Sequence, residues 1–116
     1  TIVYDYPANQ AALARVRNGK PAVAERFELY VNGIELANGY HELTEARVLE
    51  QRSAAANRAR QADGKPPLPE DNRLLAAMRH GLPPSTGVAL GFDRLVMVAL
   101  GANRLGDVMA FPFPKA

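Results

Sequence analysis

The chain has 116 residues, of which 47% are hydrophobic and 22% charged, and a formal net charge of +2 at pH 7. This length accommodates one domain, and the composition excludes a disordered tail, a collagen-like repeat and a coiled coil. The longest strongly apolar run, residues 95–100, is much shorter than the ~20 residues of a membrane-spanning helix. The chain has no cysteine, which excludes disulfides and a cysteine nucleophile and agrees with a cytoplasmic location. The small excess of positive charge does not indicate nucleic-acid binding.

The first part of the chain predicts a short strand and then a turn-rich segment. Residues 2–6 favour a strand that Pro7 ends. Residues 9–17 have the composition of a short helix, and residues 18–21 form a cluster of turn residues.

A β-hairpin is the next predicted element. Residues 27–31 alternate between apolar and polar, as in a half-buried strand. Asn32 and Gly33 follow, and this pair predicts a type I′ turn because both central residues of such a turn need a positive φ. Residues 34–43 are then expected to return as the antiparallel partner.

Two helices are predicted after the hairpin. Thr44 is a suitable N-cap for a long helix that ends near Ala62, and residues 63–69 form a proline-rich loop. A second helix is expected over residues 70–80, closed by Gly81.

The last part of the chain predicts strand, helix and strand. We expect a short buried strand at residues 87–91, a buried apolar helix at 92–100 that Gly101 ends, a turn at 103–106 and a final strand at 108–111. The element order predicts an α+β fold with an antiparallel sheet, because regular βαβ alternation and a phosphate loop are both missing.

The second strand of the hairpin carries a candidate binding face. Asn38, Tyr40 and Glu42 have the same parity, so a regular strand places them on one face. A carboxylate and an aromatic ring suit a ligand with an ammonium group on an aliphatic stem. Glu35 has the opposite parity and joins this face only if the strand bulges, for which residues 37–39 are suitable. The alternative is an exposed sheet face with routine polar residues.

A second candidate site lies at residues 87–94, GVALGFDR. Gly87 and Gly91 allow another molecule to approach the backbone closely, and Arg94 can stack on a base or pair with phosphates. Asp93 can orient Arg94 or cap the helix. The alternative is tight packing of a strand on a helix with a surface ion pair. His41 and His80 are expected to be structural.

Together, residues 35–43 (ELANGYHEL) and 87–94 resemble the C-terminal part of the catalytic domain of class II lysyl-tRNA synthetases. The second stretch resembles motif 3 of that class, and the resemblance extends over residues 7–112. Residues 23–30, 33–39 and 87–91 are most similar to the elongation factor P lysine ligases, the short paralogues without an anticodon-binding domain. Ala89 is part of this similarity, since lysyl-tRNA synthetases typically carry Gly there.

The resemblance implies roles for particular residues. Glu35 matches the carboxylate that binds ATP through Mg²⁺, and Arg94, beside Gly91, matches the motif 3 arginine that holds ATP. Asn38, Tyr40 and Glu42 match the lysine pocket, with Glu42 near the substrate amine. Tyr40 stands where Phe is usual. Ala89 would form the pocket floor and favour (R)-β-lysine over α-lysine. The implied reaction is formation of an aminoacyl-adenylate, followed by transfer to a lysine of elongation factor P.

The resemblance also implies that other parts are missing. Nothing in residues 1–116 matches motif 1, which forms the homodimer interface in this family, or motif 2. We therefore expect a single-domain C-terminal fragment of the synthetase antiparallel-sheet core with its flanking helices, inactive alone. A lysyl-tRNA synthetase fragment with tRNA-Lys as acceptor, a non-catalytic binding or dimerisation module, and a small α+β domain with weak RNA contacts are the alternatives.

Overall fold

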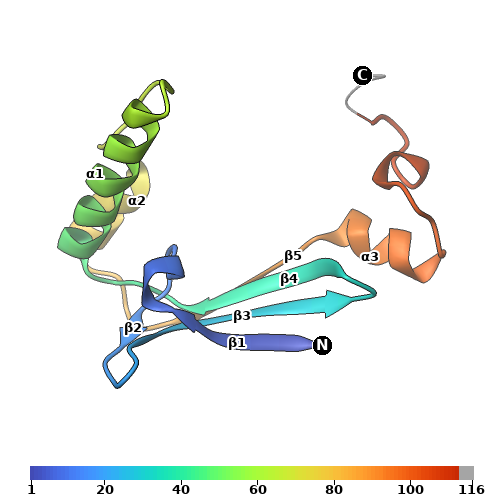
Figure 1. The fold of residues 1–116 in the computed structure, drawn as a ribbon, viewed down its shortest axis with the longest axis horizontal. Coiled ribbons are helices and arrows are strands. Elements are labelled where there is room, and N and C mark those ends of the chain that lie inside the picture. The colour runs from blue at the N-terminus through green and yellow to red at the C-terminus, as the bar shows by residue number, and fades with distance from the viewer. Residues whose placement is uncertain (113–116) are drawn as a thin grey trace.

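The fold is a five-stranded antiparallel sheet with a helical hairpin at one end and a third helix at the other (Figure 1). The computed structural model describes residues 1–112. The strands are β1 (Ile2–Pro7), β2 (Val16–Arg17), β3 (Val23–Val31), β4 (Ile34–His41) and β5 (Thr86–Leu90). They are arranged in the order β1-β3-β4-β5, and β2 pairs with the start of β3. The predicted α+β class is confirmed.

Three α-helices and two short 3-10 turns complete the described chain. α1 (Ala46–Ala62) and α2 (Arg73–His80) form the helical hairpin, and α3 (Phe92–Ala99) follows β5. The 3-10 turns are Ala8–Gln10 and Leu105–Asp107. None of the helices in the described part of the chain is long and apolar enough to cross a membrane.

The β3–β4 hairpin is built as its sequence predicts. Asn32 and Gly33 have φ values of 51° and 77°, the left-handed conformations that a type I′ turn needs. Beyond the turn, Tyr30 lies opposite Glu35 but Leu29 lies opposite Ala37, so Leu36 is an extra residue in β4. This β-bulge changes which side chains share a face of the sheet.

The two faces of the sheet differ in character. Phe27 and Leu29 belong to the apolar face, and the Phe27 ring lies so close to Gly39 that a Cβ there would overlap it. That Cβ would also come within 2.9 Å of the Gly87 carbonyl oxygen. Gly39 therefore lets the ring lie flat against β4. The opposite face carries Arg26, Glu28 and Tyr30 of β3 and Asn38 and Tyr40 of β4.

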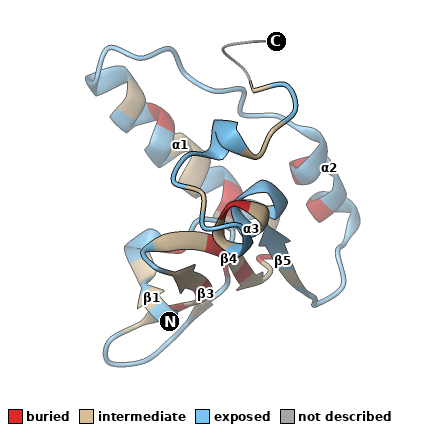
Figure 2. Cartoon of the chain, turned by 90° about the vertical axis from the view of Figure 1, so that its right-hand side faces the viewer, coloured by how far each residue is buried: buried red, intermediate tan, exposed pale blue. Residues whose placement is uncertain are grey.

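Most of the small buried core lies where the helical hairpin meets the sheet (Figure 2). This part consists of two clusters, namely Leu43, Leu49, Leu75 and Met78 at the base of the hairpin, and Ala11, Ala14 and Ala24 beside β3. Leu36 and Ala37 of β4 and Met97 of α3 are buried as well. Arg52 links α1 to the segment that carries the alanine cluster, because its Nη1 donates to the carbonyl oxygens of Ala12 (2.6 Å) and Ala14 (2.9 Å).

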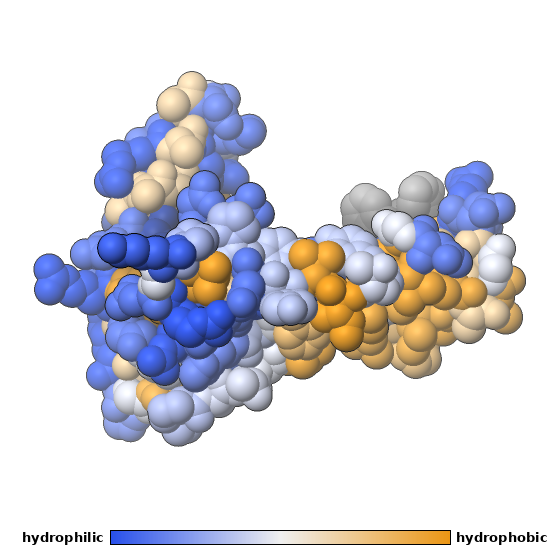
Figure 3. Space-filling view, turned by 60° about the horizontal axis from the view of Figure 1, so that its bottom comes forward, coloured by the Kyte–Doolittle hydropathy of each residue, from blue (hydrophilic) through white to orange (hydrophobic). Residues whose placement is uncertain are grey.

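The expected burial of β5 and α3 is wrong for the described structure. Val88 is 63% exposed, Phe92 68% and Leu100 72%, while Met97 is the buried residue of α3. Figure 3 shows hydrophobic residues gathered over the half of the molecule that carries α3. These elements are apolar enough to need a cover, but within residues 1–112 most of their apolar side chains stay exposed. Exposed apolar surface of this kind is typical of interaction surfaces.

The helix expected at residues 9–17 is not formed beyond the Ala8–Gln10 turn. The segment pairs instead with two strands: Arg15 N donates to His41 O (2.8 Å) and Glu25 N donates to Arg15 O (2.9 Å). Backbone groups used in this way are not available for helical hydrogen bonds. Tertiary pairing thus overrides the local helix propensity.

The remaining differences concern element ends. α1 begins one residue later than expected, with Glu45 rather than Thr44 as N-cap, and α2 begins at Arg73 rather than at residue 70. Asn72 caps α2 by accepting from Leu75 N at 2.9 Å. The expected strand at 108–111 is absent from the described structure, because Val108 N bonds back to Leu105 O (3.1 Å) and continues the 3-10 turn.

Candidate functional site

The polar face of β3, β4 and β5 brings most of the predicted site residues together. In one row across the strands, Asn38 lies between Glu28 of β3 and Ala89 of β5. In the next row, Tyr40 lies between Arg26 and Gly87. Residues that are far apart in the sequence therefore stand on one surface.

Glu35 joins this face through the bulge at Leu36. Without the extra residue its side chain would point to the apolar face, whereas in the structure it lies opposite Tyr30 and beside Asn38. The Asn38 Nδ2 donates to Glu35 Oε1 at 3.4 Å. The prediction that a bulge brings Glu35 to the face is confirmed, although the bulge lies at Leu36 and not at residues 37–39.

Arg94 reaches the same place from the other end of the chain. The turn after β5 is attached to β4 by a 2.8 Å hydrogen bond from Gly91 N to Leu36 O. From the first turn of α3, Arg94 Nη1 donates to Glu35 O at 2.9 Å and lies 3.7 Å from Glu35 Oε2. The partner of the guanidinium is therefore Glu35 and not Asp93. A Cβ on Gly91 would lie 3.2 Å from Arg94 Cδ, so this glycine leaves room for the arginine stem.

Tyr40 and Glu42 extend the face towards the helical hairpin. The Tyr40 ring packs against the alanine cluster beside β3, and the Arg26 guanidinium lies 5.9 Å from its centroid. Glu42 follows β4, with its backbone N–H bonded to Ser85 O at 2.9 Å. Its carboxylate lies against Gly87.

A buried carboxylate that sequence reasoning missed stands on β3, at the side of this face next to β1. Glu28 is 5% exposed and accepts hydrogen bonds from Tyr6 Oη (2.6 Å), Tyr30 Oη and the Arg26 guanidinium. The bonds from Tyr30 and then Tyr6 lower the pKa of Glu28, while burial opposes this change. Glu28 is therefore ionised at neutral pH and fixed in position.

The pKa values of the two tyrosines change in the opposite direction, upwards. Burial, followed by the bond to Glu28, raises the pKa of Tyr6. The bond to Glu28 is the main cause that raises the pKa of Tyr30. Both phenols stay protonated and act as donors to the carboxylate. Arg26 also lies 4.5 Å from the Tyr6 ring centroid, which adds a cation–π contact.

The pattern of the hairpin contains the information that leads to Glu28. Glu28 and Tyr30 alternate with Phe27 and Leu29, and a two-residue turn places Glu28 near the height of Asn38. Attention to the polar parity of the first strand, and not only of the second, would have found this residue.

The other sequence candidates lie outside this face. His41 Nδ1 lies 2.7 Å from Glu25 Oε2, which agrees with the expected structural role. In residues 1–112 no three His, Cys, Asp or Glu side chains are close enough to hold a metal ion by themselves. A metal ion at this site would need further ligands.

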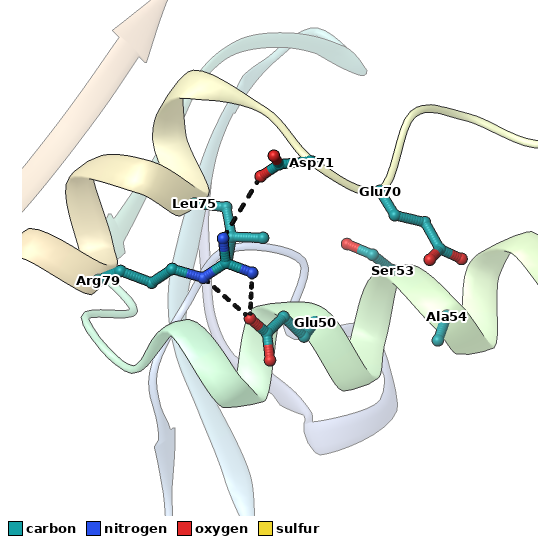
Figure 4. A pocket seen from close by; sticks show the side chains of 7 residues that line it. All are labelled: Glu50, Ser53, Ala54, Glu70, Asp71, Leu75 and Arg79. Atoms are coloured by element: carbon teal, nitrogen blue, oxygen red, sulfur yellow. Dashed lines mark hydrogen bonds and ion pairs between the residues drawn. The ribbon is translucent and has the colours of Figure 1, made fainter.

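A pocket of about 530 Å³ lies elsewhere, between α1 and α2 (Figure 4). Glu50, Glu70 and Asp71 line it, and Arg79 is paired with Glu50 (2.9 Å) and Asp71 (3.5 Å). All these pairs are exposed, so they contribute little stability. The pocket is a crevice of the helical hairpin and lacks the aromatic and amide groups of the sheet face.

The sheet face offers separate places for an anion and for a cation. Arg94 is half exposed and can turn further N–H donors to a phosphate. Glu35 is one-third exposed, and its contacts to Asn38 and Arg94 are long, so its oxygens fit Mg²⁺ shared with phosphates and water. Glu42 supplies a second carboxylate, suited to an ammonium group.

Comparison with known proteins places this arrangement in context. The family of class II tRNA synthetases (D, K and N) matches residues 1–115. The whole chain is 56% identical to an elongation factor P–(R)-β-lysine ligase from Salmonella arizonae and 57% identical to one from Enterobacter sp.. A ligase of the same name from Edwardsiella ictaluri is 54% identical over 98% of the chain. The chain spans about a third of these relatives, 36% of the first two and 35% of the third.

Proposed function

The chain belongs to the class II tRNA synthetases of the D, K and N group, and we propose that its parent protein activates lysine or (R)-β-lysine with ATP and transfers it to a lysine of elongation factor P. The observation that carries this proposal is the meeting of Arg94 with Glu35, 59 residues away, on the face that also holds Asn38, Tyr40 and Glu42. The relatives that share 54–57% of the sequence are ligases by name, which supports the same choice.

The proposed reaction has two steps. In the first, a carboxylate oxygen of the amino acid attacks the α-phosphorus of ATP, an O–P bond forms, and pyrophosphate leaves. In the second, the neutral ε-amine of the acceptor lysine attacks the carbonyl carbon of the adenylate, an amide bond forms, and AMP leaves with release of a proton. Neither step needs a covalent enzyme nucleophile, so catalysis depends on positioning and charge neutralisation.

Arg94 and Glu35 are the residues proposed for ATP. Arg94 is held at the strand–helix junction by its bond to Glu35 O, and half of its side chain stays exposed there. Gly91 keeps the arginine stem close to the backbone. Bound Mg²⁺ would neutralise charge on the phosphates, and Glu35 is the carboxylate that would hold it. The Asn38 amide keeps the Glu35 side chain turned to this face.

The amino acid is proposed to lie beside ATP, towards the helical hairpin. Glu42 would pair with its side-chain ammonium, and the Tyr40 ring would pack against the aliphatic stem. Ala89 stands beside Asn38 in the sheet, so its methyl group would limit the space at the other end of the amino acid. This is the basis for a preference between β-lysine and α-lysine.

The test is ATP–pyrophosphate exchange by the full-length protein, with (R)-β-lysine and α-lysine measured side by side. Faster exchange with β-lysine, and labelling of elongation factor P, would support the proposal. Faster exchange with α-lysine and charging of tRNA-Lys would instead support a lysyl-tRNA synthetase. A protein that binds neither ATP nor lysine would contradict both activities and favour a non-catalytic module.

A further inference from the structure

Gly87 has no conformational reason to be glycine. It lies in β5, opposite Tyr40, and its φ is outside the left-handed region that favours glycine. Any residue can adopt this extended backbone without strain. The reason for a glycine must therefore be the space that a side chain would fill.

That space is filled by the Glu42 carboxylate. A Cβ added to Gly87 would overlap Glu42 Oε1 and lie 3.4 Å from Glu42 Cδ and 3.9 Å from its Cγ. These three atoms are the nearest heavy atoms outside the two chain neighbours of Gly87. The nearest group that a side chain at Gly87 would meet is thus the Glu42 carboxylate.

Gly39 shows a different reason for glycine. A Cβ there would overlap the Phe27 ring and lie 2.9 Å from the Gly87 carbonyl oxygen, which is backbone of the neighbouring strand and cannot move without disturbing the sheet. At Gly87 the obstacle is the far end of a flexible side chain. An alanine at Gly87 can be accommodated by rotation of Glu42 alone, so the fold survives while the carboxylate moves.

The other side of Glu42 is also occupied by a small residue. Ala14, which is fully buried, forms an antiparallel bridge with Glu42. Glu42 therefore has a small residue as its backbone neighbour on this side, while its carboxylate lies against Gly87 on the other.

We infer that Gly87 is a positioning residue that holds the Glu42 carboxylate in the subsite for the ammonium group of the substrate. Its missing side chain lets the carboxylate lie flat on β5, within the same face as Tyr40, where it meets the end of an aliphatic stem. The inference rests on the proposed function, because it assigns to Glu42 the recognition of that ammonium group.

The experiment compares the full-length enzyme with its Gly87→Ala variant in ATP–pyrophosphate exchange. At saturating ATP, the KM for lysine should rise about tenfold, because a charge-assisted pair is displaced, while the KM for ATP stays unchanged. Norleucine, whose stem ends without an ammonium group, serves as a competitive inhibitor. Its inhibition constant should not change, because it makes no ion pair with Glu42.

Gly106→Ala is the matched control. It adds the same methyl group at a glycine whose Cβ would lie at an ordinary 3.7 Å from Pro112 Cβ. Both variants should keep the parent's thermal unfolding midpoint, and Gly106→Ala should also keep its KM for lysine.

Three results would overturn the inference in distinguishable ways. An unchanged KM for lysine in an active Gly87→Ala enzyme shows that the glycine does not position Glu42. A parallel loss of lysine and norleucine binding, or unfolding of the variant, shows general damage to the sheet. Absence of lysine-dependent exchange in the parent enzyme removes the proposed function and this inference together.

Discussion

The buried cluster of Glu28 with Tyr6, Tyr30 and Arg26 is expected to contribute strongly to stability, and one substitution tests this. Glu28→Gln keeps the size of the side chain but removes its charge. The amide offers one acceptor oxygen where the carboxylate now receives Tyr6, Tyr30 and Arg26. Its NH₂ group would face donors, so at least one of these contacts must be lost.

The magnitude follows from the burial of the groups. Hydrogen bonds to a charged group are worth about 1.5–3 kcal/mol, and breaking a buried ion pair costs about 3–5 kcal/mol. Arg26 keeps 18% of its side-chain exposure and a 2.8 Å bond to Gln10 O, so the lower end applies. We expect Glu28→Gln to reduce the free energy of unfolding by about 3 kcal/mol at neutral pH.

The sign of the pH dependence follows from the lowered pKa of Glu28 in the folded state. A carboxyl group whose pKa is lower in the folded than in the unfolded protein stabilises the fold above its unfolded pKa. This contribution is lost as the pH falls through the folded pKa. The difference in the free energy of unfolding between the parent and Glu28→Gln should therefore be largest at neutral pH. It should shrink below about pH 4.

Equilibrium urea unfolding of the full-length protein across this pH range measures both effects. Glu50→Gln is the control, since Glu50 pairs with Arg79 on the surface and should cost less than about 1 kcal/mol. The reasoning is refuted if Glu28→Gln costs no more than this control, or if its cost persists undiminished at about pH 3.

Three further substitutions test other parts of the structure. Ala89→Gly in the full-length enzyme should reduce the discrimination against α-lysine by about 1–3 kcal/mol, because a methyl group is lost beside Asn38. Unchanged relative exchange rates for α-lysine and (R)-β-lysine would contradict this. Arg94→Lys should raise the KM for ATP about tenfold, because a lysine side chain lacks the planar fork of the guanidinium, while the KM for the substrate lysine should change little. An unchanged KM for ATP would argue against a contact between Arg94 and a phosphate. Asn72→Ala should lower stability by about 1 kcal/mol in urea unfolding, because Leu75 N loses its cap, whereas Asn72→Asp should preserve it.

Local sequence was sufficient for some elements. The Asn32–Gly33 turn predicted the hairpin because its left-handed conformations depend on those residues and not on distant contacts. Gly81 marks the end of α2 for a similar reason, whereas the starts of α1 and α2 were expected one and three residues too early. Local information failed for residues 9–17, where hydrogen bonds to β3 and β4 replaced a helix of adequate propensity.

For the candidate site too, local alternation predicted some positions and the pairing of strands decided others. Strand parity predicted that Asn38 and Tyr40 share a face, because alternation is a property of the strand itself. Parity alone puts Glu35 on the opposite face, and only the bulge at Leu36, seen in the register between β3 and β4, brings it to the side of Asn38. That Glu28 belongs to the candidate site followed only from this register, which places it opposite Asn38.

Residue order thus specified the hairpin turn, the glycine that ends α2 and the chemical types on each strand, since all of these arise within a few residues. The contact of Arg94 with Glu35 and the fit of Glu42 over Gly87 required the folded sheet, because they join segments 59 residues apart and on neighbouring strands. The exposure of Phe92 and Leu100 likewise depends on what packs over α3, and an apolar sequence specifies the need for a cover but not the segment that provides it.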